Sequence, residues 1–279
     1  MLMIFLTALA LVWLVFAIVS DLRTREIPNW LNFSLIIFAL GIRFFDSLFN
    51  ANWNFFMQGV FGFVVFFILA NILYYGRFFA GGDAKLLMAL GPIIPFNIDY
   101  VSNVNLFSVF LFLFFLSGAI YGIIVLLLMS IKNFLKIKRD FAKQIKNNKK
   151  IIIMSLVLSI ILLISAYFYS LLAILAILIF ISPYLVIYTK IVDNVCMVAR
   201  VKTSQLTEGD WLYKDIKVGG KIMKAKWEGL SKKEIKILKN KYKFVLIKRG
   251  IEFSPVFLIS FLVYVYLYII GINLWDSLW

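Results

Sequence analysis

Two aspartates, Asp21 and Asp83, lie beside apolar stretches of a 279-residue chain. Two carboxyl groups that are brought together in a low-dielectric site cannot both ionise comfortably, so they share a proton. The ionised carboxylate can then activate water, while its protonated partner polarises a scissile carbonyl group. The two aspartates are therefore candidates for the catalytic pair of a hydrolase.

The rest of the composition leaves few other routes to hydrolysis. The chain has no histidine and one cysteine, Cys196. The lack of histidine excludes Ser-His and Cys-His nucleophiles, and one cysteine excludes disulfides within the chain and zinc sites made of Cys and His. Hydrolysis would have to depend on carboxylates, lysine or a bound metal. Because nothing indicates a metal, we expect neither a metal nor another cofactor.

Each aspartate has a distinctive local sequence. Asp83 lies in segment 79–85 (FAGGDAK), where the paired glycines Gly81 and Gly82 let a peptide or a second helix approach closely. Asp21 lies in segment 20–29 (SDLRTREIPN), a short charged turn whose Pro28 is well placed to start a helix.

Composition places these segments in a membrane protein, because 63% of the residues are hydrophobic and only 15% are charged. Apolar runs of about 20 residues are long enough to cross a bilayer as helices. The predicted spans cover residues 1–20, 30–48, 54–75, 85–97, 105–131, 151–169, 171–189 and 254–272. We expect an all-α multi-spanning membrane protein with about eight transmembrane helices and a small cytosolic α/β insertion.

The charge distribution predicts the orientation of these spans. The formal net charge is +15, and basic blocks follow the first, third, fifth and seventh spans, whereas the connections at 49–54 and 97–105 contain neither Lys nor Arg. The positive-inside rule then predicts a multi-pass protein of the cell membrane whose N-terminus is outside and whose basic loops and aspartates are cytosolic. Arg43 is an exception within a span; we expect it to pair with Asp46 or to snorkel outward.

The first apolar run, residues 1–20, has no basic region before it and no cleavage pattern after it. We therefore expect it to remain as a membrane span.

Only residues 190–250 are long and polar enough for a soluble module. Turn signals occur at residues 208–210 and 218–220. The spacing of Ser231 and Glu234 is that of a capping box and predicts a helix to about Lys241. Residues 244–248 are expected to be extended. The predicted domains are a membrane bundle at 1–189, a basic cytosolic insertion at 190–250 and a final span with a short tail at 251–279. The simplest partner of the insertion is anionic lipid headgroups. Alternative partners are the substrate and the secretion machinery, and nucleic acid is not expected.

At these residues the chain resembles the type IV prepilin peptidases, and especially their archaeal branch, which includes preflagellin peptidases. The family's first motif, Asp-x-Arg-x-x-x-Ile-Pro-Asn, is matched by Asp21, Arg23, Ile27, Pro28 and Asn29. Its second motif, Gly-x-Gly-Asp with Lys two residues after the Asp, is matched by Gly82, Asp83 and Lys85. The first glycine of that motif is Ala80 here, so a requirement for positive φ at this position would disturb the loop.

The resemblance covers residues 10–95, and a weaker match covers residues 250–257. It implies an aspartic endopeptidase, with Asp21 and Asp83 as catalytic residues, that removes the short basic leader from pilin-like or archaellin precursors at the cytosolic membrane face. Some bacterial relatives carry a four-cysteine zinc module and methylate their product. A single cysteine excludes that module, so methylation is not expected.

The roles of several neighbours stay open. Lys85 could tune the pair or anchor the helix at the membrane surface, Arg23 could set topology or contact substrate, and Glu252 could be a third acidic residue near the site or simply interfacial. We do not include Glu252 in the catalytic set.

Two other functions are weaker interpretations. A presenilin-like intramembrane protease would have Tyr-Asp and Pro-Ala-Leu motifs, whereas Ser20 precedes Asp21 and Val256 follows Pro255. A transporter, or a platform component of a pilus or secretion machine, is the non-enzymatic alternative. Transport pathways usually need charged residues inside spans, and these spans contain few.

Overall fold

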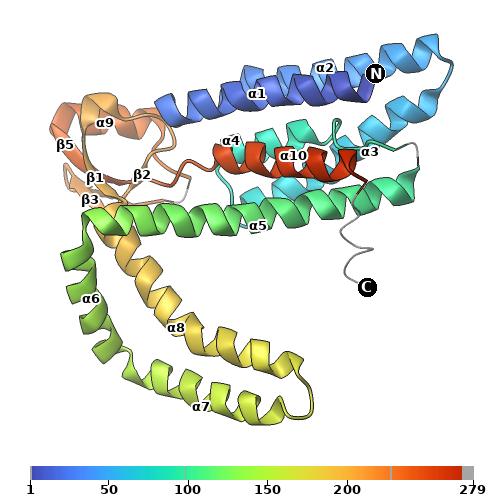
Figure 1. The fold of residues 1–279 in the computed structure, drawn as a ribbon. Coiled ribbons are helices and arrows are strands. Elements are labelled where there is room, and N and C mark those ends of the chain that lie inside the picture. Colours follow the sequence, from blue (N-terminus) through green and yellow to red (C-terminus); the bar gives the residue numbers. More distant parts are fainter. Residues whose placement is uncertain (1, 98, 227, 272–279) are drawn as a thin grey trace. The chain divides into compact units, whose positions relative to one another are not determined.

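The computed structural model describes residues 2–97, 99–226 and 228–271. The chain divides into two compact units, one made of residues up to Gly122 together with those from Glu252, and the other of Ile123–Ile251. Helices dominate both units, and a small sheet region lies in the second (Figure 1).

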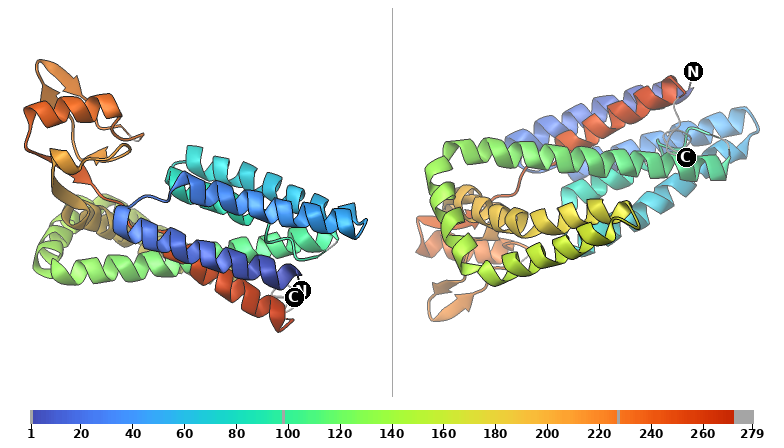
Figure 2. Two further views of the ribbon diagram at one scale, coloured as in Figure 1. Left: turned by 90° about the horizontal axis from the view of Figure 1, so that it is seen from above. Right: turned by 60° about the horizontal axis from the view of Figure 1, so that its bottom comes forward.

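The first unit is a helical bundle that contains both aspartates. Its elements are α1 (Leu2–Thr24), α2 (Asn29–Phe49), α3 (Trp53–Tyr75), α4 (Gly81–Leu90), the first two thirds of α5 (Tyr100–Lys132), and α10 (Ser254–Ile269). Helix α1 packs along α10, and α2 packs along α3; the short helix α4 packs against both α2 and α3 (Figures 1 and 2).

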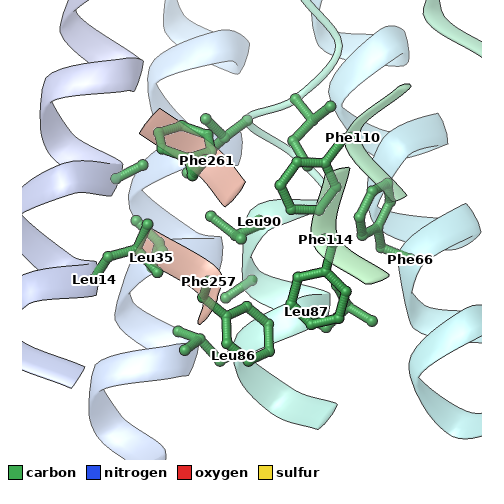
Figure 3. Close-up of a cluster of buried hydrophobic side chains, with 14 of the residues drawn as sticks. Leu14, Leu35, Phe66, Leu86, Leu87, Leu90, Phe110, Phe114, Phe257 and Phe261 are labelled. Atoms are coloured by element: carbon green, nitrogen blue, oxygen red, sulfur yellow. The ribbon is translucent and has the colours of Figure 1, made fainter. Parts of the chain in front are cut away.

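The core of this unit is built from one apolar face of each helix, since every helix contributes side chains that are almost completely buried. Figure 3 labels ten of these residues: Leu14, Leu35, Phe66, Leu86, Leu87, Leu90, Phe110, Phe114, Phe257 and Phe261. Many large apolar side chains lie on the outside instead, for example Ile37, Ile72 and Ile123, as expected for helices that face lipid rather than water.

Five of the described helices are long and apolar enough to cross a membrane: α1, α2, α3, α5 and α8 (Leu171–Cys196). A sixth candidate is the pair α6 (Phe134–Asn147) and α7 (Lys149–Ser165), which is bent by 75°. Helix α10 is apolar but shorter, and α4 has only ten residues. Each predicted apolar run contains a helix, but the count of eight crossings is not confirmed.

Helix α4 is short because Gly91 and Pro92 follow it, and a proline cannot donate a backbone hydrogen bond. The chain nevertheless stays buried through residue 96. Its backbone lies so close to α3 that a Cβ atom on Gly91 would approach the Gly62 carbonyl oxygen to 2.7 Å. Two glycines at this crossing therefore bring α3 and the end of α4 into direct backbone contact.

Arg43 has a different role from the two that the sequence suggested. It is 0% exposed and neither pairs with Asp46 nor snorkels outward. Its guanidinium donates from Nη1 to the Phe55 carbonyl at 3.0 Å and from Nη2 to the Pro95 carbonyl at 2.6 Å, while the Asp46 carboxylate accepts from Asn50. The turn after α4 presents backbone carbonyl oxygens inside the bundle. Hydrogen bonds from Arg43 to these buried oxygens stabilise the fold more than an exposed ion pair with Asp46 would.

The second unit begins in α5 and contains α6, α7 and α8. Helices α7 and α8 form an antiparallel hairpin, and α6 also packs against α8 (Figure 2). Ile137, Ile187, Ile191 and Val192 are buried where α6 meets α8, and the Ser130 and Tyr188 hydroxyls are hydrogen-bonded at 2.6 Å.

A small α/β module follows α8. Strand β5 (Phe244–Lys248) is the centre of an antiparallel sheet with the order β1-β5-β2, where β1 is Val198–Lys202 and β2 is Trp211–Leu212. Strands β3 (Ile216–Val218) and β4 (Lys221–Met223) form a separate hairpin. A 3₁₀ turn at Thr203–Gln205 and helix α9 (Lys232–Lys241) complete the module.

The local predictions for this module are confirmed. Ser231 and Glu234 form a capping box, and α9 ends at Lys241. The second turn signal lies between β3 and β4, where Gly219 and Gly220 have φ angles of 58° and 82°. Such angles favour glycine, which explains why the turn signal was readable.

The glycine contact between α3 and the end of α4 gives a stability test. A Cβ atom at position 62 would overlap the Gly91 carbonyl oxygen, so we expect Gly62→Ala to destabilise the protein by about 1–3 kcal/mol. Gly41→Ala is the matched control, because a Cβ atom there meets nothing within 4 Å. Thermal unfolding in detergent compares the two variants. Equal midpoints for both would show that the backbone contact is not tight.

Candidate active site

Asp21 lies near the C-terminal end of α1 on the face that packs into the bundle. The buried residues Leu6, Ala10, Leu14 and Ala17 precede it at helical spacing, and Asp21 itself is only 8% exposed. Its Oδ2 atom accepts a hydrogen bond of 3.4 Å from the backbone N–H of Ser254, the first residue of α10. A carboxylate thus lies where the N-terminal end of α10 meets α1, and a helix N-terminus favours negative charge.

The turn after Asp21 is held by its own hydrogen bonds. Arg25 has a φ of 60°, and its N–H donates to the Asp21 carbonyl at 2.7 Å. The hydroxyls of Ser20 and Thr24 both donate to the Glu26 carbonyl, at 2.9 and 3.2 Å. This small network reverses the chain between α1 and α2 within a few residues.

Pro28 precedes the first residue of α2 with φ −60° and ψ 137°. The sequence prediction that it starts the second helix is therefore confirmed to within one residue. Its fixed φ limits the conformations open to the chain as α2 begins.

Asp83 lies in the first turn of α4, where a carboxylate is favoured by the helix dipole. Ala80, the residue before this helix, has φ −71° and ψ 159°, an extended conformation that any residue adopts. The replacement of the motif's first glycine by alanine therefore creates no backbone strain here.

Gly82 brings the two motifs into contact. A Cβ atom at this position would lie 3.4 Å from Cβ of the buried Ile27, so the start of α4 packs closely on the turn before α2. One turn further along, Lys85 Nζ donates to Asn29 Oδ1 at 2.7 Å. Lys85 thus links the second motif to the first, a contact that neither open role for this residue anticipated. Gly81 lies beside Tyr74, whose ring would be 3.7 Å from an added Cβ atom.

The electrostatics of Asp83 reflect this packing. Its pKa is raised from the ordinary value of 3.8 to about 7, chiefly by burial and then by the negative charge of Asp21, while a backbone hydrogen bond from Ala80 acts in the opposite direction. Asp83 precedes the apolar residues of α4 and lies outside the candidate spans. The two aspartates, far apart in sequence, therefore lie within electrostatic range of each other, and one of them holds a proton near neutral pH.

Two residues that sequence reasoning did not place in the site lie beside Asp21. Glu252 Oε1 pairs with Arg25 Nη2 at 2.6 Å, and the Glu252 carbonyl accepts from the Tyr121 hydroxyl at 2.9 Å. Asp21 and Glu252 are both within electrostatic range of that phenol. The sequence contained a signal for Glu252, because an acidic residue directly before a span is unusual, but it contained none for Tyr121. Arg23 is exposed in the last turn of α1.

Among residues 2–97, 99–226 and 228–271, there is no group of three or more His, Cys, Asp or Glu side chains that could hold a metal ion. The arrangement instead provides two neighbouring carboxyl groups at one end of a bundle, and the pKa of one of them, Asp83, is raised to about 7. Such a pair can act as base and acid on the same bond.

Comparisons with known proteins agree on one family. The preflagellin peptidase of Methanococcus maripaludis is 25% identical over 148 residues, which are 50% of this chain and 62% of that protein. The preflagellin peptidase of Methanocaldococcus jannaschii is 34% identical over 82 residues, 29% of this chain and 35% of that protein. A third, from Methanococcus voltae, is 27% identical over 88 residues, 32% of this chain and 37% of that protein.

The matched regions thus span less than two thirds of the length of each of these relatives. No solved structure matches the chain. Residues 8–131, which contain both aspartates, match the type IV leader peptidase family. This region of the chain is therefore similar to the type IV leader peptidase family, and the three relatives point to the same family.

Proposed function

We propose that the protein is a membrane-embedded aspartic endopeptidase that removes the short basic leader peptide from archaellin or pilin-like precursors. The observation that supports this proposal most is the packing of the Asp83 motif on the Asp21 motif, through Gly82 against Ile27 and Lys85 on Asn29, and the charge of Asp21 raises the pKa of Asp83 accordingly. The match of residues 8–131 to the type IV leader peptidase family supports leader-peptide cleavage, and the relatives that are named preflagellin peptidases support precursors of this kind as substrates.

The proposed mechanism uses the different protonation of the two carboxyl groups. Ionised Asp21 takes a proton from a water molecule, whose oxygen forms a bond to the scissile carbonyl carbon. Protonated Asp83 donates a hydrogen bond to the carbonyl oxygen and stabilises the charge that develops there. The C–N bond then breaks, and the proton held by Asp21 passes to the leaving amine. Gly82, Pro28 and the Lys85–Asn29 contact position the two motifs for this step.

The proposed location is the cell membrane of an archaeal cell, with the N-terminus outside. Asp21, Asp83 and the basic turn at Arg23 and Arg25 would then lie at the cytosolic face, where a precursor still carries its leader. We propose residues 1–189 and 251–279 as the membrane part of the enzyme and residues 190–250 as its cytosolic insertion.

Helix α6 supports a second partner, anionic lipid headgroups. It presents apolar residues such as Ile137 and Phe141 to its neighbours, and it carries five exposed basic residues: Lys136, Lys138, Arg139, Lys143 and Lys146. An amphipathic basic helix between apolar helices fits the membrane–water interface. Lipid, rather than nucleic acid, is therefore the proposed partner of the basic surface.

The catalytic pair is tested by removing one carboxyl group at a time. We expect Asp21→Asn and Asp83→Asn each to reduce cleavage of a tagged precursor in membranes by about 10³-fold or more, because neither residue can replace the other's role. Asp46→Asn is the control. Asp46 lies near the C-terminal end of α2 and its carboxylate contacts Asn50, whereas the motif residue Asn29 begins that helix. The readout is the gel shift on loss of the leader. If either variant of the pair cleaves like the control, the mechanism is wrong.

The protonation of Asp83 predicts the upper limit of the pH profile. Because its pKa in the folded protein is raised to about 7, the protonated form is present below that pH and is lost as pH rises through it. We expect kcat/KM, which reports the pKa of the free enzyme, to fall about tenfold per pH unit above pH 7. Size-exclusion chromatography at each pH checks that the protein stays intact. A flat profile up to pH 9 would contradict a role for protonated Asp83.

A further inference from the structure

The chain that enters α10 is fixed directly over Asp21. Three side chains of the first unit hold residues 252–254: Arg25 pairs with the Glu252 carboxylate, Tyr121 donates to the Glu252 carbonyl, and Asp21 accepts from the Ser254 N–H. Phe253, between them, packs so closely on α5 that a Cβ atom at Gly118 would lie 2.8 Å from its ring. The backbone of this segment is therefore held in place from both sides.

The position of the Glu252 carboxylate relative to Asp21 follows from this attachment. Glu252 is two residues before Ser254, so their Cα atoms are at most about 7 Å apart. An extended peptide advances about 3.3 Å per residue. A peptide whose scissile bond lies at Asp21 would therefore bring a side chain only one or two residues away from that bond within reach of Glu252.

The Glu252 carboxylate already binds a cation. The Arg25 guanidinium contacts it at 2.6 Å, which shows that the space around it accepts the side chain of a basic residue. The Arg25 side chain is 45% exposed and that of Glu252 is 21% exposed. Such a half-exposed ion pair is held weakly and can be exchanged for another cation at small cost.

We propose that Glu252 forms the specificity subsite for the basic leader residue next to the scissile bond, which displaces Arg25 from the carboxylate when substrate binds. This inference rests on the proposed function and adds to it the residue that selects the substrate. It also resolves an electrostatic difficulty. The chain carries a net charge of +15, which as a whole repels a basic leader, and a fixed carboxylate offsets this repulsion where the leader binds.

The simplest other explanation of the same contacts is a tether, in which Arg25 and Glu252 only join α1 to the entry of α10. The two explanations differ in what loss of Arg25 does. A tether loses function when either partner is removed. A subsite loses affinity without Glu252 but gains affinity without Arg25, because Arg25 competes with substrate for the carboxylate.

The experiment measures kcat and KM in detergent or membranes for two precursors, one with Lys before the scissile bond and one with Glu there. The variants are Glu252→Gln, Glu252→Lys and Arg25→Ala. Glu26→Gln is the matched control, because Glu26 is an exposed carboxylate on the same turn as Arg25. Glu252→Gln is nearly isosteric, so it tests the subsite even if Glu252→Lys does not fold.

With the Lys precursor, we expect Glu252→Gln to raise KM about tenfold or more while kcat changes little, as for a lost charge-assisted contact to the ground state. Arg25→Ala should lower KM for the same precursor. Glu252→Lys should reverse the preference and cleave the Glu precursor better than the Lys precursor. Glu26→Gln should behave as wild type with both.

Two results would overturn the subsite. If Glu252→Gln cleaves both precursors with wild-type constants, Glu252 does not bind the leader. If Arg25→Ala and Glu252→Gln lose activity equally, the ion pair is a tether. Wild-type protein that cleaves neither precursor, nor any other pilin-like precursor, would instead overturn the proposed function itself. That outcome is distinct, because both results against the subsite require active wild-type enzyme.

Discussion

The free energy needed to hold two carboxyl groups near each other in poorly solvated surroundings is the constraint on which the first unit depends. The structure meets it in three ways. Each carboxylate lies at a helix end, with Asp83 in the first turn of α4 and Asp21 against the N-terminal end of α10. Backbone N–H groups donate to both of them. The pKa of Asp83 is also raised to about 7, so below that pH a proton on Asp83 removes its charge from the neighbourhood of Asp21.

Asp83 lies at the start of a helix that does not continue as a regular span. Helix α4 has ten residues, and the buried chain beyond it presents carbonyl oxygens inside the bundle that need hydrogen-bond donors from the protein. Arg43 supplies the missing donors at Ile93 and Pro95. Gly59 on α3 leaves room for its side chain, since a Cβ atom there would overlap Arg43 Cδ. Asp83 thus lies at one end of this segment and the carbonyls that Arg43 binds lie at the other, so Arg43 makes the irregular course of the segment tolerable.

The parts of the site that were predictable from the sequence are those encoded by short-range chemistry. Pro28 starts α2, Asp83 lies in the first turn of α4, and the capping box at Ser231 starts α9, because each depends on neighbours within one helical turn. Arg43 and Tyr121 were not predictable in their roles. Their partners lie 52 and 131 residues away at Pro95 and Glu252, and no local pattern encodes such a contact. The number of spans was also not predictable, since hydropathy shows where a segment is apolar but not whether its helix crosses the membrane.

The completion of the site by residues 252–254 explains why its substrate contacts are harder to read than its catalytic pair. Residues 8–131, which match the family, supply both aspartates, Arg25 and Tyr121. The segment that binds Asp21 and carries Glu252 lies more than a hundred residues later, beyond the whole second unit. In the proposed enzyme, catalysis is therefore specified by one continuous region and recognition by a second, distant one. A change at Glu252 would then alter which leaders are accepted while leaving both aspartates in place, because the contact that this segment makes with Asp21 itself is a backbone N–H that any residue except proline can provide at position 254.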